Sequence, residues 1–205
     1  MIYVIGDSHA DPYRARLPIV ELVHGRFVTM HAFSNNEFDT SYLKENDIIL
    51  IVFGEVDIRF HLSYQLNLGR DINEIIETLV SQCETKIKSF PKCKIMIRSV
   101  VPPLRNTSLL NRSCKHGITA SIELRIHGVK LLNERLQEMC KRNGFIFVPS
   151  PPWIEKDGEM MDEYSDGEIH IGRDHHQRVY DDFIQQILGL GFEVSSNPQL
   201  YFIKV

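Results

Sequence analysis

The sequence has no surplus of positive charge and no long hydrophobic run. Its 205 residues include 23 Lys and Arg against 27 Asp and Glu, which gives a formal net charge of −4. Proteins that bind nucleic acid need a basic surface for the phosphates, so we expect no nucleic acid partner. No apolar run approaches the ~20 residues that cross a bilayer, and the N-terminus shows no signal-peptide pattern. We therefore predict a cytoplasmic protein with no membrane association.

Cysteine is scarce, and none of it is arranged for metal binding. No pair has the C-x-x-C spacing, and no cluster of Cys and His has the spacing of a zinc site. Free thiols in a reducing compartment are the expected state of the four cysteines, which are Cys83, Cys93, Cys114 and Cys140. The sequence therefore predicts neither a disulfide framework nor a metal site.

Short apolar segments alternate along the chain with segments of helical periodicity. The segments that we interpret as strands are residues 2–5, 27–30, 47–53, 94–101 and 145–148. Those that we interpret as helices are residues 11–23, 71–90, 118–142 and 174–188. This alternation is typical of parallel βαβ units and predicts a three-layer α/β fold. Polar loops are expected at residues 31–46, 104–117 and 153–165.

The length of the chain suits one domain, since domains usually contain about 100–200 residues. We assign residues 1–190 to this domain. Residues 191–205 end in an apolar stretch that either adds an edge strand or makes a dimer contact. The oligomeric state stays open.

Three polar clusters stand where predicted strands end or in the late loop. They are Asp7-Ser8-His9, the segment 54–61, and the segment 166–170. A nucleophilic serine needs a base within hydrogen-bond reach, and the base needs an orienting carboxylate. Ser8, His170 and Asp166 meet this requirement by residue type. The alternative for the first cluster is an ordinary turn with Asp7 or Ser8 as a helix N-cap.

In these motifs and their order the chain resembles the SGNH or GDSL-type hydrolases. Gly6-Asp7-Ser8 stands at the first block of that family, the segment 54–61 at the third, and the segment 166–170 at the fifth. The resemblance implies a three-layer α/β/α sandwich of flavodoxin type with a mainly parallel sheet. It also implies that Ser8 is the nucleophile, His170 the base and Asp166 the orienting acid, with no cofactor.

The sequence departs from the family pattern at the oxyanion donors. The third block is usually Gly-x-Asn-Asp, whereas this chain has Gly54-Glu55-Val56-Asp57, and valine has no donor. The variant resembles a subgroup with the pattern G-E-[IV]-D-x-R-x-H that often accompanies sugar-modifying proteins. The second-block glycine has no counterpart in residues 31–36, and the late acid and base are four residues apart instead of three.

Several polar groups are candidates to line the substrate cleft or to replace the missing donors. The candidate donors are the backbone N–H of Ser8 or His9, the Arg59 guanidinium, and the amide of Asn35 or Asn36. Glu55, Asp57 and Arg59 would share one side if the central strand continued, where they either contact substrate or form a structural ion-pair network. The remaining members of the predicted substrate and oxyanion set are Asp7, His9, Gly54 and His61.

The function expected from these residues is hydrolysis of an O-acyl ester, such as O-acetyl on a carbohydrate, through an acyl-enzyme on Ser8. The expected partner is a small-molecule or glycan ester. One alternative is a sugar O-acyltransferase that uses the same site, since exclusion of water decides between the two. The other is a non-catalytic glycan-binding or scaffold domain on the same fold.

Overall fold

Four parallel strands form the centre of the molecule. The computed structural model describes residues 2–14, 29–37, 39–45, 47–105, 120–167, 169–193 and 203–204. The strands are β1 (Ile2–Gly6), β2 (Ile48–Val52), β3 (Lys94–Arg98) and β4 (Ile146–Val148). They lie in the order β1-β2-β3-β4, and each neighbouring pair is parallel. The predicted parallel sheet is therefore confirmed.

Successive residues of each strand face opposite sides of the sheet, so the sheet separates two apolar cores. Ile49 and Ile51 belong to the core on one face. Ile48, Leu50 and Val52 belong to the core on the other face. A strand buried on both faces reads as one unbroken apolar run, which is why β2 is the clearest strand signal in the sequence.

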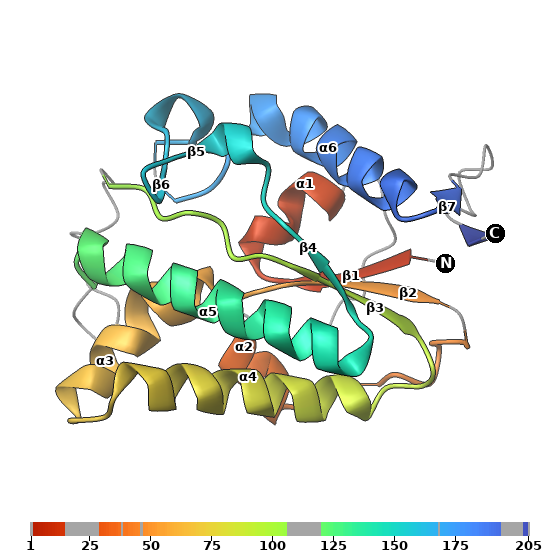
Figure 1. Cartoon of the computed structure of the whole chain (residues 1–205), viewed down its shortest axis with the longest axis horizontal. Helices are drawn as coiled ribbons and strands as arrows, with labels where there is room; N and C mark the ends of the chain where they lie inside the picture. Colours follow the sequence, from red (N-terminus) through yellow and green to blue (C-terminus); the bar gives the residue numbers. More distant parts are fainter. Residues whose placement is uncertain are drawn as a thin grey trace.

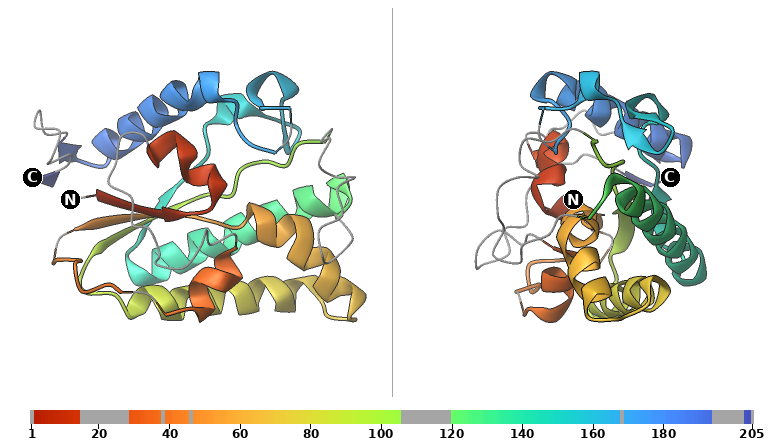
Figure 2. Two further views of the ribbon diagram at one scale, coloured as in Figure 1. Left: turned by 180° about the vertical axis from the view of Figure 1, so that it is seen from behind. Right: turned by 90° about the vertical axis from the view of Figure 1, so that its left-hand side faces the viewer.

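Helices cover both faces of the sheet. One face carries α1 (Asp11–Arg14) and α6 (His176–Gly189), and the other carries α2 (Met30–Asn35), α4 (Ile72–Lys88) and α5 (Ile122–Asn143) (Figure 1). The views in Figure 2 show the same three layers from behind and from the side. The predicted three-layer α/β/α sandwich is therefore confirmed.

The ends of the long helices follow from local sequence. Asp71 precedes α4, and its carboxylate accepts the N–H groups of Asn73 and Glu74 at 2.8 and 3.3 Å. Ser121 caps α5 in the same way. Gly144 ends α5 with a φ of +69°, a conformation that glycine adopts without a steric penalty. Side-chain oxygens at the first turn and glycine after the last are the usual helix signals, so both predicted helices are confirmed.

Two predicted segments have a different structure. Thr29 and Met30 were expected to end a strand, but Thr29 caps α2 and Met30 begins it, while residues 27–28 lie outside the described part. The segment after Gly54 does not continue as a strand. It turns helical at Glu55 and contains η2, a turn of π-helix (Asp57–His61), followed by α3 (Leu62–Asn67). The condition under which Glu55, Asp57 and Arg59 would share one side, a continued strand, is therefore not met.

Short elements follow β4. A 3₁₀ turn (Pro152–Ile154) leads into a hairpin of β5 (Glu155–Lys156) and β6 (Glu159–Met160). Further 3₁₀ turns span Asp162–Tyr164 and Arg173–His175. Beyond α6, β7 (Phe192–Glu193) pairs with β8 (Ile203–Lys204) in a separate two-stranded sheet. The division at residue 190 stays a prediction, and most of the predicted loop 104–117 lies outside the described residues.

Within the part of the chain that the structure describes, no helix combines the length and the apolar character needed to cross a membrane.

Candidate active site

The turn after β1 presents Ser8. A Cβ atom at Gly6 would lie 2.6 Å from the Val52 carbonyl oxygen and 2.8 Å from Ala10 Cβ, so only glycine fits where the turn crosses the end of β2. Asp7 N–H donates to the same Val52 carbonyl oxygen at 3.1 Å. The Asp7 carboxylate caps the 3₁₀ turn η1 (Ser8–Ala10) by accepting the His9 N–H at 2.8 Å. Because Asp7 takes the N-cap role, the Ser8 hydroxyl is left for other chemistry.

The segment 165–171 forms a closed loop that carries His170. Ser165 and Ile171 form an isolated antiparallel bridge, and Asp166 N–H donates to the His170 carbonyl at 2.9 Å. Asp166 Oδ1 accepts the N–H groups of Ile169 and His170, both at 3.1 Å. Gly167 turns the chain with a φ of +81°. The four-residue spacing of the acid and the base is accommodated by this turn.

The loop brings the three predicted catalytic residues together. Ser8 Oγ lies 2.8 Å from His170 Nε2, and His170 Nδ1 lies 2.9 Å from Asp166 Oδ2. Both distances are within normal hydrogen-bond length. The serine, imidazole and carboxylate are therefore in contact in the order that a nucleophile, a general base and an orienting acid require.

His9 lies directly beside this triad. Its ring centroid is 5.1 Å from that of His170. Its Nδ1 is 3.1 Å from Asp7 Oδ1, and its Nε2 is 3.1 Å from the Ile169 carbonyl oxygen. Burial, the largest single cause, lowers the pKa of His9, but the Asp7 carboxylate, Glu55 and the Ile169 carbonyl together raise that pKa to about 9.

The third-block charges form a buried cluster. Glu55 Oε2 lies 3.1 Å from Arg59 Nη2, one helical turn later, and both side chains are buried. Arg125 from α5 adds a second guanidinium, 2% exposed, whose pKa is lowered mainly by burial and raised in part by the charge of Glu55. The structural ion-pair alternative fits Glu55 and Arg59, and the structure gives no support to Arg59 as an oxyanion donor.

The Asp57 carboxylate contacts a different element, the start of α2. It accepts the N–H groups of Met30 and His31 at 2.7 and 3.2 Å, so it satisfies the first turn of α2. Burial, more than any other cause, raises the pKa of Asp57 to about 7. The rings of His31 and His61 lie 5.7 Å apart, and both line a cavity of about 190 Å³ together with Asp57. Ser8 does not line that cavity.

Most of the candidate oxyanion donors are already bonded to other groups. The Asn35 amide donates to the His31 carbonyl at 2.8 Å and to Gln82 at 3.3 Å, so it is not aimed at the triad. Asn36 likewise donates to the Ala32 carbonyl. The His9 N–H is occupied by Asp7. Ser8 stands first in η1, where the backbone N–H has no acceptor within the turn.

Gly54 turns the chain from β2 into the helical segment. Its φ is +119°, and a Cβ atom there would lie 2.7 Å from Val100 and 3.0 Å from Leu132. Its carbonyl accepts the Ile58 N–H at 3.0 Å, which begins the helical hydrogen bonds. The glycine is therefore required for the turn and for close packing against α5.

A polar cavity adjoins the triad. Its volume is about 350 Å³, and Ser8, His9, Asp166 and His170 form part of its wall. The remaining lining residues are Asp11, Pro12, Ile171, Arg173 and His176. Of these, Asp11, Arg173 and His176 were not predicted. The sequence shows that they lie near helix starts, but it does not show which cavity their side chains line. Arg125 was missed for a similar reason, since the helical pattern of α5 says nothing of its partner.

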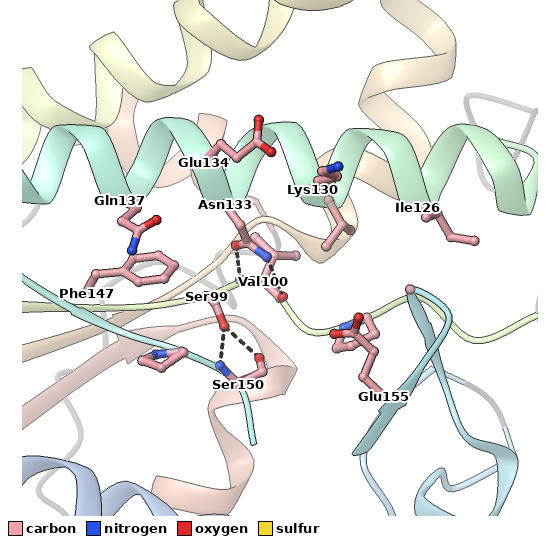
Figure 3. A pocket seen from close by; sticks show the side chains of 14 residues that line it. Ser99, Val100, Ile126, Lys130, Asn133, Glu134, Gln137, Phe147, Ser150 and Glu155 are labelled. Carbon is pink, nitrogen blue, oxygen red and sulfur yellow. Dashed lines mark hydrogen bonds between the residues drawn. The ribbon is translucent and has the colours of Figure 1, made fainter. Parts of the chain in front are cut away.

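A third cavity of about 370 Å³ lies between α5 and the ends of β3 and β4 (Figure 3). Ser99 and Ser150 line it, but their hydroxyls are 2.7 Å apart and bonded to each other. The Asn133 amide bonds both the N–H and the carbonyl of Val100. Among the described residues no histidine lines this cavity, so neither serine has an imidazole base there.

Metal ligands are not grouped in the described ranges, where no set of three or more His, Cys, Asp or Glu side chains is placed to hold an ion. His175 and His176 instead approach the carbonyls of Glu163 and Ile171, each at 3.0 Å. Cys83, Cys93 and Cys140 are free thiols, and Cys114 lies outside the described residues.

No family model and no curated protein matches this sequence. Solved structures do match. A GDSL-like lipase from Bacteroides thetaiotaomicron has a TM-score of 0.56 at 14% identity, over 92% of this chain and 87% of that one. An aryl esterase from M. smegmatis has a TM-score of 0.54 at 14% identity, over 92% and 98%. A carbohydrate acetylesterase from Sinorhizobium meliloti has a TM-score of 0.52 at 15% identity, over 92% and 98%.

These similarities define the fold of the chain. It is the three-layer α/β/α fold of the SGNH hydrolases, as the resemblance of the motifs implied. At such identities the likeness shows the fold alone.

Proposed function

We propose that this chain is a serine esterase that removes a small O-acyl group, such as acetyl, from a carbohydrate. The observation that carries the proposal is the contact of Ser8 Oγ with His170 Nε2 at 2.8 Å, completed by His170 Nδ1 and Asp166 at 2.9 Å. The fold is also that of known esterases, among them a carbohydrate acetylesterase.

The mechanism follows from the roles of the three side chains. His170 Nε2 takes the proton of Ser8 as Oγ attacks the ester carbonyl, and Asp166 stabilises the imidazolium that forms. The backbone N–H of Ser8 faces the developing oxyanion from the first position of η1. The C–O bond to the alcohol then breaks, and His170 returns the proton to the leaving oxygen. A water molecule, deprotonated by His170, then attacks the acyl carbon. The bond to Ser8 Oγ breaks, His170 returns the proton to Oγ, and the acid leaves.

The cavity beside Ser8 supports a polar alcohol as the leaving group. Asp11, Arg173 and His176 line it, and its volume of about 350 Å³ falls in the range of small-ligand sites. Side chains of this kind offer hydrogen bonds to sugar hydroxyls. A long acyl chain would instead require an apolar wall.

Labelling with a fluorophosphonate probe tests the nucleophile. We expect the probe to modify Ser8 in the native protein, and we expect Ser8→Ala and His170→Ala to abolish modification at that position while remaining folded. Loss of a triad member lowers kcat by roughly 10⁴–10⁶. Ser150→Ala is the matched control, because Ser150 also follows a strand at the same edge of the sheet. Full labelling in His170→Ala, or none in the native protein, contradicts the proposal.

Acetate release tests the reaction. We expect the protein to release acetate into water from an acetylated sugar without any second acceptor, as an esterase does. Release that requires an added sugar acceptor would assign the acyltransferase reaction instead. An unlabelled Ser8 would favour the non-catalytic domain.

A further inference from the structure

His9 follows the nucleophile directly, and both of its ring nitrogens face acceptors. Asp7 Oδ1 lies 3.1 Å from Nδ1, and the same oxygen accepts the backbone N–H of His9. The other nitrogen, Nε2, lies 3.1 Å from the Ile169 carbonyl oxygen. A neutral imidazole has one donor and one acceptor nitrogen, and only the imidazolium donates from both. The two contacts are therefore both hydrogen bonds only when the ring is protonated.

The surroundings of His9 stabilise that charge. The ring is only 7% exposed. It faces Asp7 from its own turn and Glu55 from the segment after β2. It also faces the Ile169 carbonyl and the His170 ring, which belong to the loop that carries the general base His170 (the base loop). Burial lowers the pKa of His9, but the Asp7 carboxylate, Glu55 and the Ile169 carbonyl together hold it near 9. The cation is thus the resting state at neutral pH.

The Nε2 contact joins two parts of the site that are far apart in the sequence. Ile169 immediately precedes His170, so a hydrogen bond to its carbonyl restrains the backbone that carries the base. The two ends of this loop are joined by the Ser165–Ile171 bridge and by Gly172 N–H, which donates to the Tyr164 carbonyl at 2.8 Å. The far end of the loop contacts the turn that carries Ser8 and His9 (the nucleophile turn). His170 contacts the Ser8 hydroxyl, and the Ile169 carbonyl contacts His9.

We propose that His9 is a positioning residue whose imidazolium fastens the base loop to the nucleophile turn and so keeps His170 within reach of Ser8. The role of His9 rests on the proposed esterase reaction. When the ring loses one proton, the nitrogen beside the Asp7 carboxylate keeps its hydrogen because the negative charge stabilises it. Nε2 then presents a lone pair to the Ile169 carbonyl oxygen, and the contact becomes repulsive.

Two substitutions separate the contacts of the ring. His9→Gln keeps a donor near the place of Nε2 and loses the charge, whereas His9→Asn keeps a donor near Nδ1 and loses the contact with Ile169. We expect the rate of Ser8 labelling at pH 7.5 to stay within about threefold of the native rate in His9→Gln. In His9→Asn we expect a loss of roughly tenfold or more, since small displacements of catalytic groups cost up to about 10² in rate.

The pH dependence of the labelling rate distinguishes this role from a purely structural one, which would leave that dependence unchanged. The native rate should fall above about pH 9, the pH at which His9 loses its proton. The rate of His9→Gln should stay level there, because glutamine does not titrate. Equal losses in the two variants, or the same alkaline fall in His9→Gln, overturn the proposal.

Nitrogen NMR of the histidine side chains tests the protonation state without any activity. In the Ser8→Ala protein we expect both nitrogens of His9 to carry protons at pH 7.5 and to titrate near pH 9. A neutral ring at pH 7.5 overturns the proposal even where Ser8 is reactive. Failure of the esterase reaction shows itself separately, as an unlabelled Ser8 in the native protein.

Discussion

Glu55 is a buried carboxylate that forms an ion pair with the Arg59 guanidinium. Arg59 lies 3.1 Å away, and the charge of Arg125 acts on the same group. A buried charge is stable only when it is paired, and removal of one partner leaves the other charge uncompensated. The role of the pair is therefore visible only in stability measurements, and the sequence pattern alone leaves substrate contact equally open.

At the scale of the residue, we predict that Glu55→Gln lowers the free energy of unfolding by about 3–5 kcal/mol, because Arg59 then lies buried without its counter-charge. Glu74→Gln is the matched control. Glu74 forms the same kind of pair with Arg70 one turn apart, but it is exposed, so its loss should cost less than about 1 kcal/mol. Urea denaturation measures both. Equal costs would show that the Glu55 pair is not effectively buried.

At the scale of the element, α5 crosses η2 at a glycine. A Cβ atom on Gly128 would lie 2.7 Å from Leu62 Cδ2 and 3.2 Å from two carbon atoms of Ile58. Glycine inside a helix normally costs about 0.5–1 kcal/mol relative to alanine. The close approach of the two helical segments outweighs that cost, and it sets the position of the helical segment that follows Gly54.

We predict that Gly128→Ala destabilises the protein by about 1–3 kcal/mol, as overpacking of a close contact does. Gly189, at the end of α6, would place a Cβ atom more than 4 Å from every atom of the described residues beyond its chain neighbours and its own helix. Gly189→Ala should therefore be neutral or slightly stabilising. Thermal unfolding compares the two variants, and a stabilising Gly128→Ala would contradict the close packing of α5 on η2.

At the scale of the whole molecule, the pH dependence of stability follows from buried groups whose pKa is raised on folding. The pKa of Asp57 rises to about 7, mainly through burial, and that of His9 rises to about 9 against the effect of burial. For both, the native state binds more protons than the unfolded state, so stability falls as pH rises. The fall in stability that Asp57 causes lies between about pH 4 and 7, and the fall that His9 causes lies between about pH 6.5 and 9.

We predict that the free energy of unfolding decreases from pH 6.5 to pH 10 by on the order of 3 kcal/mol through His9, at about 1.4 kcal/mol for each pKa unit. The contribution of His9 is fully present below pH 6.5 and is lost as pH rises through its folded pKa of about 9. Urea denaturation at several pH values measures this slope. Between about pH 7 and 8 the slope should be absent in His9→Gln, and a persistent slope there would assign it to another group. At higher pH the thiols of Cys83 and Cys140, whose pKa is raised mainly by burial, add a fall in stability of their own in both proteins.

The periodicity of the sequence predicts the layers of this fold because it is a local property. Apolar runs such as 48–52 and the helical pattern of 72–88 depend on neighbouring residues only. Since parallel strands end at one edge of a sheet, the order of these segments also predicts that Ser8 and the segment after Gly54 meet there.

By itself, then, the sequence determined the three layers of the fold and the three residue types of the candidate triad. Only the tertiary structure decided which polar groups meet. The Ser8–His170 distance depends on how the loop that carries His170 folds back. The helical state of 55–61 depends on buried pairing and on the contact of Asp57 with the start of α2, and the contact of His9 with that loop depends on a carbonyl 160 residues away. Each of these rests on contacts between distant segments, and local patterns carry no information about distance.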